Sequence, residues 1–398
     1  MLARAVRQNK SKNFLGVVSR HKKLKNIEQS GGWQPVGASH ERMEQIMNEP
    51  DTLGAGLARR GVSRRSLLKF CTAMASLMAL PPGVALAMAG ALDQTKRQSV
   101  IWLSFQECTG CVESLTRSFE PTLEQMIFEM VSLDYQETLQ AASGEAAESA
   151  RDEAMKSSYG KYLLIVDGSI PTKDGGVYST VAGVSNHDRL IDAAKGAAAI
   201  VAVGTCSSYG GIPHANPDPT GAVSVSDIIK DKPIMNVPGC PPIPSVIAGT
   251  LAYFVTYEKL PELDHLGRPK VFFADTIHGR CYRRPFYDQG KFAKTFDDEG
   301  ARNGWCLYEL GCKGPTTHNA CATIKWNGGV SYPIESGHGC LGCSEPDFWD
   351  KGSFYQPLST PLAPNAHVVA IGALGGVAAG AVAAALSREH QTHIGEEK

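Results

Sequence analysis

Short, nearly continuous apolar runs alternate with longer stretches of helical periodicity between residues 99 and 280. The runs at 162–166 and 199–203 contain no charged residue, as expected for strands that are covered on both faces. Strands that alternate with helices imply crossover connections and a mainly parallel sheet. The pattern therefore predicts a doubly wound α/β domain with strands at 99–105, 125–133, 162–167, 199–204, 233–237 and 271–274.

The pattern changes after residue 275. Periodic apolar positions fade, glycine and proline become frequent, and six cysteines fall within residues 281–343. A region with so few periodic apolar residues needs internal cross-links of some kind. We therefore expect a C-terminal domain with little regular structure, held together through its cysteines.

A charge-free stretch at 70–92 follows Arg64, Arg65 and Lys69. Paired arginines, an apolar middle and small residues around Ala87 are typical of a twin-arginine export signal. A buried core helix is the alternative, but the Pro81-Pro82-Gly83 sequence would break such a helix near its middle. Residues 1–89 are thus predicted to be a long leader with a twin-arginine signal peptide, which implies a periplasmic protein.

A second charge-free stretch spans residues 368–386. Its length suits a helix that crosses a bilayer core, and Gly372, Gly376 and Gly380 recur every fourth residue, as small residues do where transmembrane helices pack. A tail helix docked on a soluble partner is the alternative. We expect a C-terminal membrane-anchor helix at 366–387.

Charge is distributed unevenly along the chain. The formal net charge is −1, but residues 1–69 hold 14 Lys/Arg against 5 Asp/Glu, so the rest of the chain is acidic. An acidic body argues against nucleic acid as a partner.

Four cysteines follow predicted strands, and each has a glycine within two positions. Because ligands gather outside the carboxyl ends of parallel strands, these thiols should meet at one edge of the sheet, with Asp167 on the same edge. Four thiolates bind either a four-iron cluster or a zinc ion. Zinc usually binds two Cys-x-x-Cys pairs. These four cysteines contain only one such pair, so their spacing favours an iron–sulfur cluster. The four residues are Cys108, Cys111, Cys206 and Cys240.

The C-terminal cysteines allow two interpretations. Six thiols could form three disulfides in an exported protein, but the i, i+3 spacing of Cys340 and Cys343 is typical of metal chelation. Outside the signal, which contains Cys71, ten cysteines and His278 make eleven candidate ligands. Eleven ligands suit two four-iron clusters and one three-iron cluster.

At this point the sequence resembles the small, electron-transferring subunit of nickel–iron hydrogenases over almost the whole chain after the leader. The shared motifs include Glu-Cys-Thr-Gly-Cys at 107–111, Gly-Thr-Cys at 204–206, Asn-Val-Pro-Gly-Cys-Pro at 236–241, His-Gly-Arg-Cys at 278–281, Gly-Trp-Cys at 304–306 and Gly-His-Gly-Cys-Leu-Gly-Cys-Ser-Glu-Pro at 337–346. The resemblance implies a flavodoxin-like domain at 97–270 and a C-terminal iron–sulfur cluster domain at 271–357.

The resemblance also implies which residues bind which cluster. A proximal [4Fe-4S] cluster would take Cys108, Cys111, Cys206 and Cys240; a distal [4Fe-4S] cluster would take His278, Cys281, Cys306 and Cys312; a medial [3Fe-4S] cluster would take Cys321, Cys340 and Cys343. Pro333 stands where relatives with a fourth medial thiolate place a cysteine, and proline cannot bind iron.

By the same resemblance, the nickel–iron centre lies in a separate large subunit, so this chain holds no catalytic residue, with Glu107 as a candidate for moving protons. Electrons from hydrogen oxidation would pass to a membrane cytochrome b-like or other integral-membrane acceptor. Two alternative functions stay open here. One is a quinone-reductase-type iron–sulfur subunit, and the other is an exported binding module that is cross-linked by zinc or disulfides.

Overall fold

The computed structural model describes residues 64–78, 80–94, 97–351 and 354–358. The chain divides into two units, residues 1–50 and 51–398, and all described residues belong to the second. Residues 1–63 of the expected leader and the expected anchor at 366–387 lie outside the described residues. None of the helices in the described ranges has both the length and the apolarity needed to cross a membrane.

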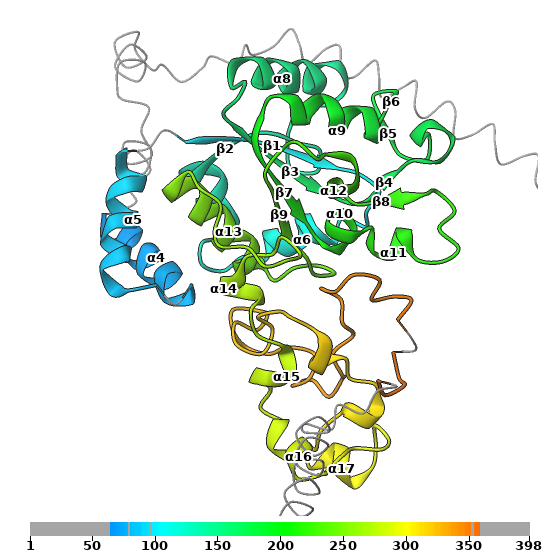
Figure 1. The fold of residues 1–398 in the computed structure, drawn as a ribbon. Helices are drawn as coiled ribbons and strands as arrows, with labels where there is room; N and C mark the ends of the chain where they lie inside the picture. The colour runs from blue at the N-terminus through cyan, green and yellow to red at the C-terminus, as the bar shows by residue number, and fades with distance from the viewer. Residues whose placement is uncertain (1–63, 79, 95–96, 352–353, 359–398) are drawn as a thin grey trace, which may run out of the picture. The chain divides into compact units, whose positions relative to one another are not determined.

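Five parallel strands form the central sheet (Figure 1). Their order, β2-β1-β3-β7-β9, runs outward in both directions from the first strand, which confirms the doubly wound parallel sheet. The strands are β1 (Gln98–Ser104), β2 (Val131–Gln136), β3 (Tyr162–Asp167), β7 (Ala197–Val203) and β9 (Ile234–Val237).

Alternate residues of the strands enter two separate cores. Leu163 and Ile165 of β3 pack with α6 (Gly110–Thr116) and α13 (Pro244–Tyr257) on one face. Leu164 and Val166 pack with α8 (Gly144–Ser157) and α9 (Asn186–Lys195) on the other. Both faces are therefore covered, as the uninterrupted apolar runs predicted. Figure 1 shows the two helical layers on opposite sides of the sheet.

Two predicted strands are wrong in whole or in part. The run at 125–133 becomes a strand only at Val131. Its first residues continue α7 (Leu123–Gln125) into a π-helical turn, η1 (Met126–Met130), because Thr122 and Gln125 form a capping box that starts a helix. The run at 271–274 lies largely in the short helix α14 (Lys270–Phe273), since four apolar residues after a proline fit a buried helical turn equally well.

Short antiparallel pairs and single turns complete the domain around the carboxyl edge of the sheet. The pairs are β4 (Ile170–Pro171) with β8 (Ala222–Val223), and β5 (Thr180–Val181) with β6 (Val184–Ser185). The turns are η2 (Lys173–Gly176), α10 (Thr205–Tyr209), α11 (Gly211–His214) and α12 (Val225–Ile228).

The C-terminal region has only short helices joined by irregular segments. It has its own small core, which includes Ile277, Leu307, Tyr332 and Ile334. The helices are α15 (Ile277–Arg280), α16 (Arg284–Asp288), α17 (Glu299–Arg302), η3 (Tyr308–Leu310) and η4 (Gly314–Thr316) (Figure 1). This matches the expectation of a domain with little regular structure.

The described part of the leader forms two helices, α4 (Arg64–Leu77) and α5 (Pro82–Gln94), with the break at the proline pair. Cys71, Met74 and Met88 are buried in the same core as α13. A Cβ added to Gly249 of α13 would lie 3.0 Å from Cε of Met74. The apolar part of the expected signal thus packs on the sheet domain through its side chains.

Candidate metal centres

The four expected proximal ligands lie at the carboxyl edge of the sheet. Cys108 follows β1, Cys111 lies in α6, Cys206 lies in α10 after β7, and Cys240 follows β9. Burial raises the pKa of Cys111 well above the usual thiol value, and negative charge on Asp167, Cys206 and Cys240 raises it further. Burial also raises the pKa of Cys206 to about 11 and that of Cys240 to about 12, with contributions from Cys108 in both. The four thiols therefore lie within electrostatic reach of one another.

Gly204 and Gly211 lie directly against thiols of the proximal site, and we call these two residues the glycine cradle. Gly204 has φ +92, and a Cβ there would collide with Sγ of Cys111; Gly211 has φ +60, and a Cβ there would lie 2.7 Å from Sγ of Cys206. Only glycine adopts the first conformation at little cost and lets the backbone come this close to the thiols. This donor set, four mutually repelling soft ligands beside a glycine backbone, fits a bulky cationic cluster.

Two carboxylates, those of Asp167 and Glu107, lie near the proximal thiols. Trp102 Nε1 donates a hydrogen bond of 2.9 Å to Oδ1 of Asp167, which is fully buried. Burial raises the pKa of Asp167 to about 7, and the charge of Glu107 adds to the rise. Burial also raises the pKa of Glu107, although Thr109 donates a hydrogen bond to it, and the charge of Glu137 raises it further. Asp167 and Glu107 thus both hold a proton more readily than an ordinary carboxyl group.

The four expected distal ligands, His278, Cys281, Cys306 and Cys312, line one small cavity. Burial, with the charge of Arg284, lowers the pKa of His278 and keeps the imidazole neutral, the form that binds a metal. The ring of Tyr287 meets the His278 ring edge-on at 4.6 Å between centroids. The structure thus brings all four side chains to one place.

The three expected medial ligands also lie together. Burial raises the pKa of Cys321 to about 12, and negative charge on Cys343 contributes. Burial likewise raises the pKa of Cys340 well above the usual value, with further contributions from Cys312, Cys343 and Cys321. Cys340 therefore lies between the medial thiols and a distal one.

The three sites adjoin one another. Burial raises the pKa of Cys240 to about 12, and negative charge on Cys343 adds to the rise, so a proximal ligand lies near a medial one. The backbone N–H of Cys340 donates to Sγ of Cys312 at 3.3 Å, so a medial ligand contacts a distal one. The medial donor set therefore adjoins the proximal set on one side and the distal set on the other.

The described cysteines form neither disulfides nor a compact group around one point. Every cysteine in the described ranges is a free thiol. Within the same ranges, no three His, Cys, Asp or Glu side chains are grouped as they would be around one metal ion.

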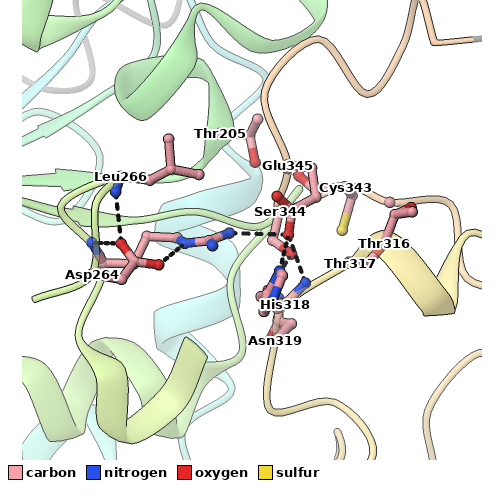
Figure 2. A network of polar contacts seen from close by, with 12 residues as sticks. Thr205, Asp264, Leu266, Thr316, Thr317, His318, Asn319, Cys343, Ser344 and Glu345 are labelled. Carbon is pink, nitrogen blue, oxygen red and sulfur yellow. Dashed lines mark hydrogen bonds and ion pairs between the residues drawn. The ribbon is translucent and has the colours of Figure 1, made fainter. Parts of the chain in front are cut away.

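Sequence reasoning missed a polar network beside the medial site. Arg268 is buried and forms ion pairs of 2.7 Å with Asp264 and 3.0 Å with Glu345. Oε1 of Glu345 also accepts the backbone N–H of His318 at 2.6 Å (Figure 2). The motif that contains Glu345 was the only sequence signal that could have drawn attention to this network.

Comparison with known proteins decides the family. Residues 273–356 match the family that describes the C-terminal part of NiFe/NiFeSe hydrogenase small subunits. The uptake hydrogenase small subunit of Afipia carboxidovorans is 47% identical over 350 residues, which cover 86% of this chain and 95% of the relative. The chain belongs to the NiFe hydrogenase small subunits. The Hydrogenase-1 small chain of Escherichia coli strain K12 is 45% identical and covers 85% of this chain and 91% of the relative.

Solved structures agree with this membership. The NiFeSe hydrogenase of Desulfomicrobium baculatum, in a reduced, active form, aligns with a TM-score of 0.63 and 40% identity, covering 66% of this chain and 100% of that chain. Residues 108–254 also match the family described as NADH ubiquinone oxidoreductase, 20 Kd subunit. That match ends before the C-terminal region, which instead matches the hydrogenase family.

Proposed function

We propose that this chain is the electron-transfer subunit of a hydrogenase that oxidises H2. The observation that carries the proposal is the closeness of the three donor sets: Thr205 links the segments of Cys240 and Cys343, and Cys340 donates to Cys312. Electron transfer over a long distance requires closely spaced redox groups, and ligand-bearing segments that are hydrogen-bonded to one another meet that requirement. Binding or structural roles do not require it.

The proposed cofactors are a proximal and a distal [4Fe-4S] cluster and a medial [3Fe-4S] cluster. Cys108, Cys111, Cys206 and Cys240 would hold the first. His278, Cys281, Cys306 and Cys312 would hold the second, and Cys321, Cys340 and Cys343 the third. When bound, such clusters accept and release single electrons. The residues of this chain supply the thiolates, exclude water and fix the order of the sites.

The proposed partner at the proximal end is the NiFe hydrogenase large subunit. Cys108 is the exposed member of the proximal set, so this site opens toward the surface where such a subunit would bind. Glu107 is the residue we propose to pass protons at this surface. Its Oε2 atom is buried and has no hydrogen-bond partner among the described residues, and burial raises its pKa above the usual carboxyl value.

We further propose that the enzyme works on the periplasmic side of the cytoplasmic membrane. The twin-arginine sequence at 63–69 supports export of the folded, cofactor-loaded protein. A membrane cytochrome b-like protein or another integral-membrane carrier would accept the electrons. The charge-free stretch at 368–386 supports a C-terminal anchor beside that acceptor.

Replacing Cys340 with serine tests the relay. Cys340→Ser removes the medial thiolate that contacts Cys312, so the three-iron signal in electron paramagnetic resonance (EPR) of the oxidised complex is expected to disappear, while assembly with the large subunit persists in part. Hydrogen-driven reduction of the membrane acceptor should fall by about two orders of magnitude or more. Ser157→Ala, at the end of α8 and outside all three donor sets, is the control and should keep every signal. Full acceptor reduction in Cys340→Ser would contradict the relay.

Deletion of residues 366–398 tests the anchor. The truncated enzyme is expected to appear in the soluble periplasmic fraction, because the charge-free stretch is lost while all proposed ligands remain. Hydrogen-dependent dye reduction should be unchanged and should now be found in that fraction. Membrane association that survives the deletion would contradict the proposed anchor.

A further inference from the structure

The hydroxyl of Thr205 lies at the junction of the proximal and medial donor sets. Thr205 is buried, precedes the proximal ligand Cys206, and donates a hydrogen bond to the backbone carbonyl of the medial ligand Cys343. The two residues are 138 positions apart in the chain. Figure 2 shows Thr205 facing the segment that holds Cys343, Ser344 and Glu345.

The same hydroxyl also accepts a hydrogen bond. The backbone N–H of Gly239 donates to Oγ1 of Thr205 at 2.9 Å, and the backbone N–H of Thr205 donates to the carbonyl of Gly239 at 3.0 Å. Gly239 precedes the proximal ligand Cys240. One side chain thus holds three ligand-bearing segments together: those of Cys206, Cys240 and Cys343.

A hydroxyl is needed for this double role because it donates and accepts at one atom. An apolar side chain of equal size would leave the Gly239 N–H and the Cys343 carbonyl without these partners at a buried site. The carbonyl would then be free to move, and Cys343 with it. Contact between the two donor sets therefore depends on where this one segment sits.

We propose that Thr205 is a positioning residue for electron passage from the proximal to the medial site. Its hydroxyl fixes Cys343 against the Gly239–Cys240 segment and so sets the contact between the two ligand shells. The inference rests on the proposed function. In the step concerned, one electron leaves the reduced proximal group and reduces the oxidised medial group, with no bond broken and no proton moved.

Three variants, each studied in the complete complex with the large subunit, distinguish the effect of the hydroxyl from the effect of side-chain packing. Thr205→Val keeps the shape and removes the hydroxyl, and Thr205→Ser keeps the hydroxyl. Ser207→Ala is the matched control. Ser207 is equally buried and also adjoins Cys206, but its hydroxyl donates only within its own segment, to the carbonyl of Val203 at 2.7 Å.

The measurements are iron content and the rate at which the oxidised three-iron EPR signal disappears after rapid mixing, once with H2 and once with dithionite. Thr205→Val is expected to keep its iron and to slow the hydrogen-driven rate about tenfold, the lower range for loss of a group that orients metal ligands. The dithionite-driven rate should not change, because a small reductant reaches the clusters without the proximal site. Thr205→Ser and Ser207→Ala should match the unsubstituted complex.

The outcomes separate this inference from the proposed function. An unchanged hydrogen-driven rate in Thr205→Val, or an equal slowing in Ser207→Ala or Thr205→Ser, would overturn the inference alone. Loss of only the three-iron signal in Thr205→Val, with recovery of that signal in Thr205→Ser, would support the inference. It would mean that Cys343 had moved out of position when the hydroxyl was removed. Absence of iron from the unsubstituted complex would instead contradict the proposed function, and the inference with it.

Discussion

Gly204→Ala is expected to empty the proximal site. The backbone of Gly204 has φ +92 and ψ 158, a conformation that only glycine adopts readily. In addition, the new Cβ would collide with Sγ of Cys111. The segment must then turn away, and Cys206, two residues later, turns with it. Iron content should fall by about four atoms per chain, as expected for loss of one cubane, and hydrogen-driven reduction of any acceptor should cease.

Gly160→Ala provides the matched control. Gly160 also has a positive φ, +77, but it precedes β3 at the opposite edge of the sheet, and a Cβ there would meet nothing within 4 Å. The variant is expected to lose about 1 kcal/mol of stability from backbone strain and no iron. Iron content and EPR of the two variants, purified side by side, provide the check. An unchanged iron content in Gly204→Ala would mean that glycine at position 204 is not required for the proximal site to hold iron.

The sheet could be predicted because its signal is local. β7 is apolar along its whole length and β3 up to its last residue, Asp167, and such runs indicate strands buried on both faces. The errors arose where local signals compete. The run at 125–133 is apolar enough for a strand, but Thr122 caps a helix at its start. The run at 271–274 is too short for its periodicity to separate strand from helix.

The candidate ligands could also be found from the sequence, because cysteines are rare and their spacing is restrictive. The residues that join the sites could not. Thr205 bonds to a residue 138 positions away, and Arg268 to one 77 positions away. Both residue types are common, and no local pattern identifies a partner so distant in the chain. Only the folded arrangement shows that the sheet domain and the cluster region share these contacts.

Arg268→Met is expected to weaken the medial site through the loss of a buried charge. The guanidinium is 1% exposed and lies between Asp264, on the sheet domain, and Glu345, two residues after Cys343. Burial tends to raise the pKa of Asp264, but hydrogen bonds from the backbone and side chain of Arg268 outweigh it and lower that pKa. Methionine fills a similar volume and leaves both carboxylates without this partner. Removal of one member of a buried ion pair typically costs about 3 to 5 kcal/mol.

The loss should appear first at the medial site, because Glu345 also accepts the backbone N–H of His318, three residues before Cys321. On heating, the three-iron EPR signal of Arg268→Met is expected to be lost about 10 °C below that of the unsubstituted complex. Lys270→Met is the control, since Lys270 and Glu262 form an exposed ion pair that contributes about 1 kcal/mol or less. Arg268→Lys should fall between the two, because an ammonium keeps the charge but cannot engage both carboxylates as a planar fork does. Equal heat resistance of Arg268→Met and Lys270→Met would mean that the cluster region is held to the sheet domain by its apolar contacts alone.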